Sequence, residues 1–118
     1  MAKSNSVHAT TNEIPAWIES FLIDRQAGNL SPNTIRFYRQ HLNKFAAYCD
    51  AVGIGALEYL RADDLRRFLL WLEGEGHNPG GIHCHYRICK TFFRWWVIES
   101  DTRDYNQIFR KVDRKSVV

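Results

Sequence analysis

A repeated segment, whose two copies begin 47 positions apart, constrains the fold of this chain more than any other feature. The first copy opens with Ser31-Pro32-Asn33-Thr34-Ile35 and the second with Asn78-Pro79-Gly80-Gly81-Ile82. A capping side chain followed by proline is a strong start signal for an α-helix. Apolar residues then recur at i, i+7, i+10, i+11 and i+14, which is one face of a helix. These positions pair Ile35, Leu42, Phe45, Ala46 and Cys49 with Ile82, Cys89, Phe92, Phe93 and Trp96.

Helix start and stop signals predict four helices, at about 13–27, 31–51, 63–73 and 78–99. Ile54, Leu57 and Leu60 are expected to hold the loop at 53–62 against the core, and residues 105–112 are expected to form a short final helix. We therefore predict an all-α fold, a four-helix orthogonal bundle of two helical hairpins with a short C-terminal helical extension. The expected organisation is a flexible lead-in at 1–12, the four-helix domain at 13–100, and a linker toward a separate domain at 101–118.

Composition excludes several classes of protein. With 45% hydrophobic residues, the 118-residue chain is expected to be a folded domain rather than a disordered segment. No apolar run approaches the roughly 18 residues of a membrane span, and the polar N-terminus does not resemble a signal peptide. Three cysteines without paired spacing favour a reduced, cytoplasmic protein over a disulfide framework.

A second face also corresponds between the two repeated segments, and it is polar or basic. It pairs Arg36, Gln40, Asn43 and Ala47 with His83, Arg87, Lys90 and Arg94. No Asp or Glu occurs at 31–49 or at 78–98, whereas residues 58–76 contain five. The net charge of +3 is mild, but this segregation of charge by helix is the pattern expected of a surface that meets a polyanion.

The order of these elements resembles the core-binding (SAM-like N-terminal) domain of tyrosine recombinases, the phage integrase family. The resemblance extends over about residues 14–112 and depends on the order and spacing of short motifs. The matching elements are Ser31-Pro32-Asn33-Thr34-Ile35 with Tyr38, Asp64-Leu65-Arg66-Arg67-Phe68-Leu69, and Lys90-Thr91-Phe92-Phe93-Arg94-Trp95.

This resemblance implies a function in DNA recombination. In that family the domain forms half of a clamp around duplex DNA at the recombination half-site, and its second and fourth helices face the major groove. The implied partners are double-stranded DNA, a catalytic domain of the same parent chain, and further copies of the full-length protein on DNA, with no membrane. The implied DNA-binding residues are Asn33, Thr34, Arg36, Arg39, Gln40, Asn43, Lys44, His83, Arg87, Lys90 and Arg94.

The chain departs from the family pattern at Gly81, where Thr or Ser is usual, at Arg61, where Thr commonly caps the third helix, and at Gln107, where Pro usually follows Asn. The family's catalytic H-x-x-R element is absent, and no tyrosine has the context of the nucleophile. We therefore expect no catalytic residues, no cofactor and no strand cleavage by this chain, which is interpreted as a binding module excised from a longer tyrosine recombinase.

Other interpretations remain open at this point. The basic faces could be ordinary solvated surface on a helical protein–protein interaction module, or could belong to a stand-alone DNA-binding regulator. His83, Cys84, His85 and Cys89 resemble a zinc cluster, but the absence of a second ligand pair favours core packing and no metal site. Trp71, Trp95 and Phe37 could form an apolar patch for a partner. The glycines at 80 and 81 either allow close approach of a phosphate or simply weaken the helix.

Overall fold

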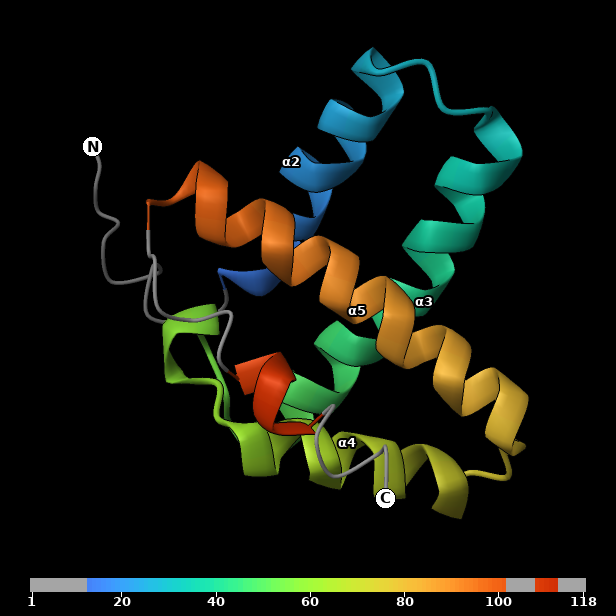
Figure 1. The fold of residues 1–118 in the computed structure, drawn as a ribbon, viewed down its shortest axis with the longest axis vertical. Coiled ribbons are helices and arrows are strands. Elements are labelled where there is room, and N and C mark those ends of the chain that lie inside the picture. The colour runs from blue at the N-terminus through green and yellow to red at the C-terminus, as the bar shows by residue number, and fades with distance from the viewer. Residues whose placement is uncertain (1–12, 102–107, 113–118) are drawn as a thin grey trace. The chain divides into compact units, whose positions relative to one another are not determined.

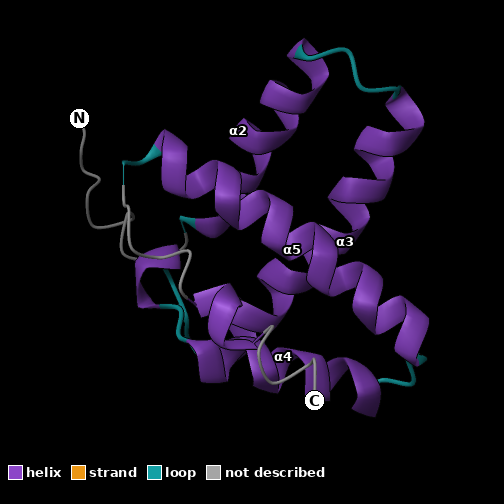
Figure 2. Ribbon diagram, in the orientation of Figure 1, coloured by secondary structure: helices purple, strands orange, loops and turns teal. Residues whose placement is uncertain are grey.

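The computed structural model describes residues 13–101 and 108–112, and these residues are almost entirely helical, with no strand among them. Their elements are α2 (Ile14–Ala27), α3 (Pro32–Val52), a 3-10 turn (Leu57–Tyr59), α4 (Ala62–Gly74) and α5 (Pro79–Glu99), shown in Figures 1 and 2. Residues 108–112 are also helical. The predicted all-α class is confirmed. The lead-in at 1–12, residues 102–107 with Gln107, and residues 113–118 lie outside the described residues.

The chain divides into two compact units, residues 1–59 and residues 60–118. In the first unit α2 and α3 pack together as a helical hairpin. Their inward side chains are Ile14, Ile18, Phe21 and Leu22 from α2 and Leu42, Phe45, Tyr48 and Cys49 from α3. As predicted, Leu57 is buried, and so is Leu60 at the start of the second unit, whereas Ile54 is only partly buried.

In the second unit α4 and α5 form the other helical hairpin. The buried side chains of α4 are Leu65, Phe68 and Leu72, and those of α5 include Cys89, Phe92, Phe93 and Trp96. The helical residues 108–112 pack on the same unit, because Phe109 and Val112 are buried. The Tyr86 hydroxyl donates a hydrogen bond of 3.3 Å to the carbonyl of Phe109.

The two repeated segments start their helices in the same way. Ser31 and Asn78 both have extended backbones, and their side-chain oxygens accept hydrogen bonds from the backbone N–H groups of Thr34 (3.2 Å) and Gly81 (2.8 Å). The resulting helices, α3 and α5, are each 21 residues long. The predicted caps and starting prolines are therefore confirmed. The capping geometry is local, so the sequence specifies it directly.

A left-handed residue ends each of the first three helices: Asn29 (φ 71°) after α2, Gly53 (φ 82°) after α3 and Gly76 (φ 96°) after α4. In each case the next residue donates its N–H to a carbonyl five residues back, at 3.2, 2.8 and 3.1 Å. This is the Schellman type of helix end, in which the reversal satisfies carbonyls that the helix leaves open. After α2 it is Asn29, and not the preceding Gly28 (φ −84°), that adopts the left-handed conformation.

The third predicted helix is one residue longer at each end than its predicted bounds of 63–73. At its start, the Asp64 carboxylate accepts a 2.8 Å hydrogen bond from the backbone N–H of Arg61. The Arg61 side chain cannot cap the helix in return, because a guanidinium has no acceptor. Asp63 and Asp64 therefore stabilise a helix N-terminus, as expected from their position.

Candidate nucleic-acid interface

The outer face of α3 is polar and lies opposite the buried side chains of the same helix. The core positions Leu42, Phe45 and Cys49 are buried. About half a turn around the helix, the exposed side chains are Asn33, Arg36, Gln40 and Asn43, and Lys44 is half-buried beside them. The structure thus places these predicted residues on one face of α3, which hereafter is the α3 outer face.

Local hydrogen bonds fix the first turn of the α3 outer face. Arg36 donates from Nη1 to Oδ1 of Asn33 at 2.8 Å, one turn earlier in the helix. Thr34 is committed to the helix cap, since its N–H donates to Ser31 Oγ and its Oγ1 lies 3.0 Å from the same atom. Asn33 and Arg36 therefore form a polar pair at the surface, and Thr34 belongs to the cap.

Arg39 does not lie on an acid-free surface, which corrects the expectation from the sequence. Its guanidinium forms an ion pair with Glu19 of α2, which is 20 positions earlier in the chain. The segment 31–49 contains no acid, but the packing of α2 against α3 supplies one. Both partners are partly exposed, at 43% for the Arg39 side chain and 53% for that of Glu19.

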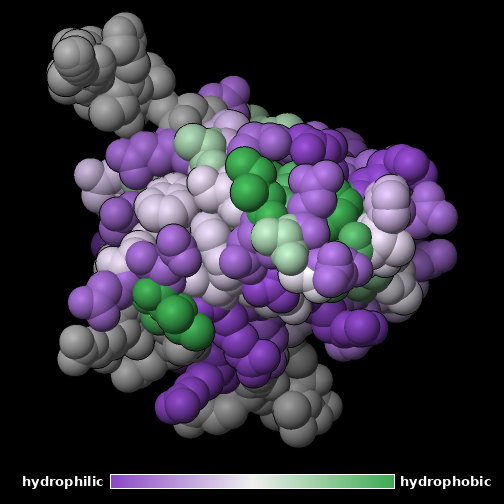
Figure 3. Space-filling model, turned by 90° about the horizontal axis from the view of Figure 1, so that it is seen from above, coloured by the Kyte–Doolittle hydropathy of each residue, from purple (hydrophilic) through white to green (hydrophobic). Residues whose placement is uncertain are grey.

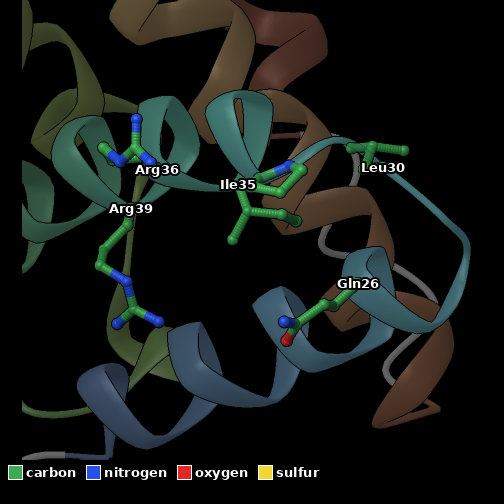
Figure 4. Close-up of a pocket in the computed structure, with 6 residues that line it drawn as sticks. Gln26, Leu30, Ile35, Arg36 and Arg39 are labelled. Carbon is green, nitrogen blue, oxygen red and sulfur yellow. The ribbon is translucent and has the colours of Figure 1, made fainter.

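Arg36 and Arg39 also line an open hollow where α2 and α3 approach the loop that joins them (Figure 4). Its cavity volume is about 230 Å³. The residues that line it are Gln26, Leu30, Pro32, Ile35, Arg36 and Arg39. Sequence reasoning missed Glu19 and Gln26, because no periodicity or motif links α2 to individual positions of α3.

The outer face of α5 repeats the arrangement of the α3 outer face. His83, Arg87 and Arg94 are exposed in a stripe at i, i+4 and i+11, opposite the buried Phe92 and Trp96. Within the described parts of the chain, neither Arg87 nor Arg94 has an acidic partner at ion-pair distance. This stripe, with Lys90 at its edge, is hereafter the α5 outer face.

Lys90 is less exposed to solvent than the arginines of the α5 outer face. It is half-buried, and its Nζ lies 6.0 Å from the centroid of the Tyr86 ring, within reach of a cation–π interaction. Its partner position in the repeat, Asn43, is exposed. Lys90 therefore lies at the border of the stripe.

Basic residues of α4 are compensated within that helix. Arg66 pairs with Asp63 at 2.6 Å and Arg67 pairs with Asp64 at 3.7 Å, each one turn apart. Arg66 also donates to the carbonyl of Lys111 at 3.4 Å. The acids of α4 thus pair with bases of α4, whereas Arg39 of α3 pairs with an acid of another helix.

The histidines and cysteines at 83–89 belong mostly to the packing of α5. His85 and Cys89 are buried, and the His85 ring makes edge contacts with Phe68 and His77. No group of three or more His, Cys, Asp or Glu among residues 13–101 and 108–112 is placed to hold a metal ion. Cys49, Cys84 and Cys89 form no disulfide.

In the apolar patch considered from the sequence, neither tryptophan is fully exposed. Trp71 and Trp95 are half-buried, each with its ring stacked on a phenylalanine of its own helix, whereas Phe37 is 44% exposed. Figure 3 shows apolar side chains in small patches among hydrophilic ones on one face of the molecule. Scattered apolar residues of this kind are ordinary on a protein surface.

Comparison with known proteins identifies the family. No curated protein and no solved structure matches the chain. Among the described residues, no helix has the length and apolar character that a membrane span requires. The family model of the phage integrase N-terminal SAM-like domain matches residues 8–99, which include both repeated helices and all of α2 and α4. The chain therefore belongs to the phage integrase family, as an N-terminal SAM-like domain.

Proposed function

We propose that this domain binds duplex DNA through the outer faces of α3 and α5, and so positions a separate catalytic domain of a site-specific recombinase. The observation that carries the proposal is the duplicated outer face. At the paired positions Arg36 and His83, and Gln40 and Arg87, both side chains are exposed and lie opposite buried apolar residues. Membership of an integrase family supports the same partner.

The side chains on these faces suit two kinds of contact with DNA. Arg39, Lys44, Lys90 and Arg94 are the candidates for phosphate contacts, which supply most of the affinity and depend strongly on salt. Arg36, Gln40, Asn43 and Arg87 are the candidates for base-edge contacts, because Arg pairs with guanine and Gln or Asn with adenine in the major groove. A domain of this size, acting alone, should bind with a Kd of roughly 10⁻⁴ to 10⁻⁶ M.

Strand cleavage is assigned to a different domain of the parent protein. The family match lies on the N-terminal SAM-like domain rather than on a catalytic one. In this proposal the chain binds the DNA and orients the catalytic domain on it. Association between copies on DNA belongs to the full-length recombinase. A protein–protein module with solvated basic faces is the competing function.

The first test is an NMR titration of backbone amides with a mixed-sequence duplex of roughly two helical turns, or about 21 base pairs. We expect shifts concentrated at 33–44 and 80–94, weaker at about 200 mM salt than at about 50 mM. If the duplex shifts no amide in either range, the proposal fails and a protein partner becomes the better hypothesis.

Substitutions then separate the two kinds of contact. Arg94→Gln should reduce the magnitude of the log–log salt slope by about 0.9, the value for one phosphate. Arg87→Gln should lower affinity for a preferred site by at least about fivefold and relax its sequence preference. Arg67→Gln on α4 is the matched control: it removes the same charge from a side chain that is 66% exposed and paired within its own helix. Equal effects from all three variants would indicate a general charge effect and contradict specific contacts.

A further inference from the structure

The ion pair between Glu19 and Arg39 places an acid against one of the proposed phosphate contacts. The carboxylate comes from α2 and the guanidinium from α3, so the pair connects the two helices of one compact unit. Both side chains are accessible to solvent. Exposed ion pairs contribute little to stability, so this one can open at small cost.

The hollow beside this ion pair is suited to an anion. Arg36 and Arg39 of α3 and Gln26 of α2 line the same space, and Figure 4 shows the Arg39 side chain extending from α3 toward α2. The Arg39 guanidinium, once it leaves Glu19, offers forked N–H donors that match phosphate oxygens. Arg36 adds the N–H groups other than the Nη1 group that donates to Asn33, and the Gln26 amide offers another donor. The volume of about 230 Å³ is several times the roughly 30 Å³ share of one water molecule, so a phosphate group and its waters fit.

We propose that Glu19 is a built-in competitor of DNA for Arg39. In the free domain the carboxylate holds the guanidinium. When DNA binds, a backbone phosphate enters the hollow beside Arg36 and replaces the carboxylate on Arg39. A phosphate can take the place of the carboxylate because both groups accept two parallel hydrogen bonds from a guanidinium. This inference rests on the proposed DNA binding and adds to it a residue that limits affinity.

The consequence is that the domain binds DNA more weakly, and with less dependence on salt, than the basic side chains of α3 alone would allow. Each binding event must break the ion pair, and the displaced Glu19 remains close to the incoming phosphate. Both effects act on the sequence-independent part of the affinity, which phosphate contacts dominate. Glu19 would thereby suppress non-specific binding without touching any base.

The test is a double-mutant cycle on the 118-residue chain, with a fluorescein-labelled mixed-sequence duplex of about 21 base pairs as the probe. Glu19→Gln should tighten binding by roughly two- to fivefold at about 50 mM salt, since an exposed ion pair no longer opposes it. Arg39→Gln should weaken binding more in the Glu19→Gln background than in the unsubstituted chain. Asp24→Asn is the control, because Asp24 is also on α2 but pairs with its neighbour Arg25.

Three outcomes would overturn the proposal. If Glu19→Gln weakens binding, Glu19 holds Arg39 in place for DNA and does not compete with it. If Arg39→Gln has no effect in either background, no phosphate replaces Glu19 on Arg39. If Asp24→Asn tightens binding as much as Glu19→Gln, only net charge matters. In each case amide shifts on the rest of the α3 and α5 outer faces would still support DNA binding, so the two proposals fail separately.

Discussion

Replacing Gly80 with alanine should stabilise this domain, whereas replacing Gly76 with alanine should destabilise it. The two glycines flank the start of α5 and lie four residues apart. A Cβ at Gly80 would meet only Asn78 Oδ1, at 3.6 Å, which is ordinary contact. A Cβ at Gly76 would meet nothing within 4 Å, but the backbone there has φ +96°. Space is available at both positions, so backbone conformation alone should determine the sign.

The magnitudes follow from these two conformations. Gly80 is helical, and alanine in place of glycine in a helix gains about 0.4–1 kcal/mol, partly by restricting the unfolded chain. Gly76 is left-handed, where an L-residue with a Cβ costs roughly 1–2 kcal/mol. The two variants should therefore differ in free energy of unfolding by about 1.5–3 kcal/mol.

The assay is urea unfolding of the two variants and the unsubstituted chain, with thermal unfolding as a second measure. For a chain of this length, 1 kcal/mol corresponds to a change in Tm of roughly 3–6 °C. Two variants that move in the same direction, or a Gly80→Ala chain that is less stable, would refute the reasoning. The same Gly80→Ala chain decides why glycine is there: lost DNA affinity would indicate close approach of a phosphate, and unchanged affinity would indicate simple helix weakening.

Two further predictions concern helix caps. Ser31→Ala and Asn78→Ala should each lower the free energy of unfolding by about 1 kcal/mol in urea titrations, because each removes the acceptor for one first-turn N–H. An effect at only one of the two sites would contradict the equivalence of the repeated segments. Arg61→Thr should raise the stability of the domain by about 0.5–1 kcal/mol, measured as an increase in Tm, since threonine can accept a bond from the first turn and arginine cannot. A fall in Tm would show that the arginine stem contributes more through packing than a cap would.

The sequence determines where the helices begin and end, because those signals act over a few residues. Ser31 and Asn78 cap the two helices that their spacing predicts, and Gly53 ends α3 in the left-handed conformation. The period of the apolar positions also determines which residues are exposed, so that Gln40 and Arg87 lie on the outer faces predicted for them. All of these features follow from backbone chemistry and helix geometry, which need no knowledge of the neighbouring helix.

Only the tertiary structure decides which side chains meet across helices. The sequence of α3 places Arg39 on an acid-free face, but α2 packs against that helix and supplies Glu19, which is 20 positions away in the chain. The hollow beside Arg36 likewise needs Gln26 of α2. These contacts depend on how two helices are rotated and offset against each other, and that is set by the packing of buried residues such as Phe21 and Phe45. A sequence pattern defines the face of one helix, and the partner of that face is fixed only when the core is packed.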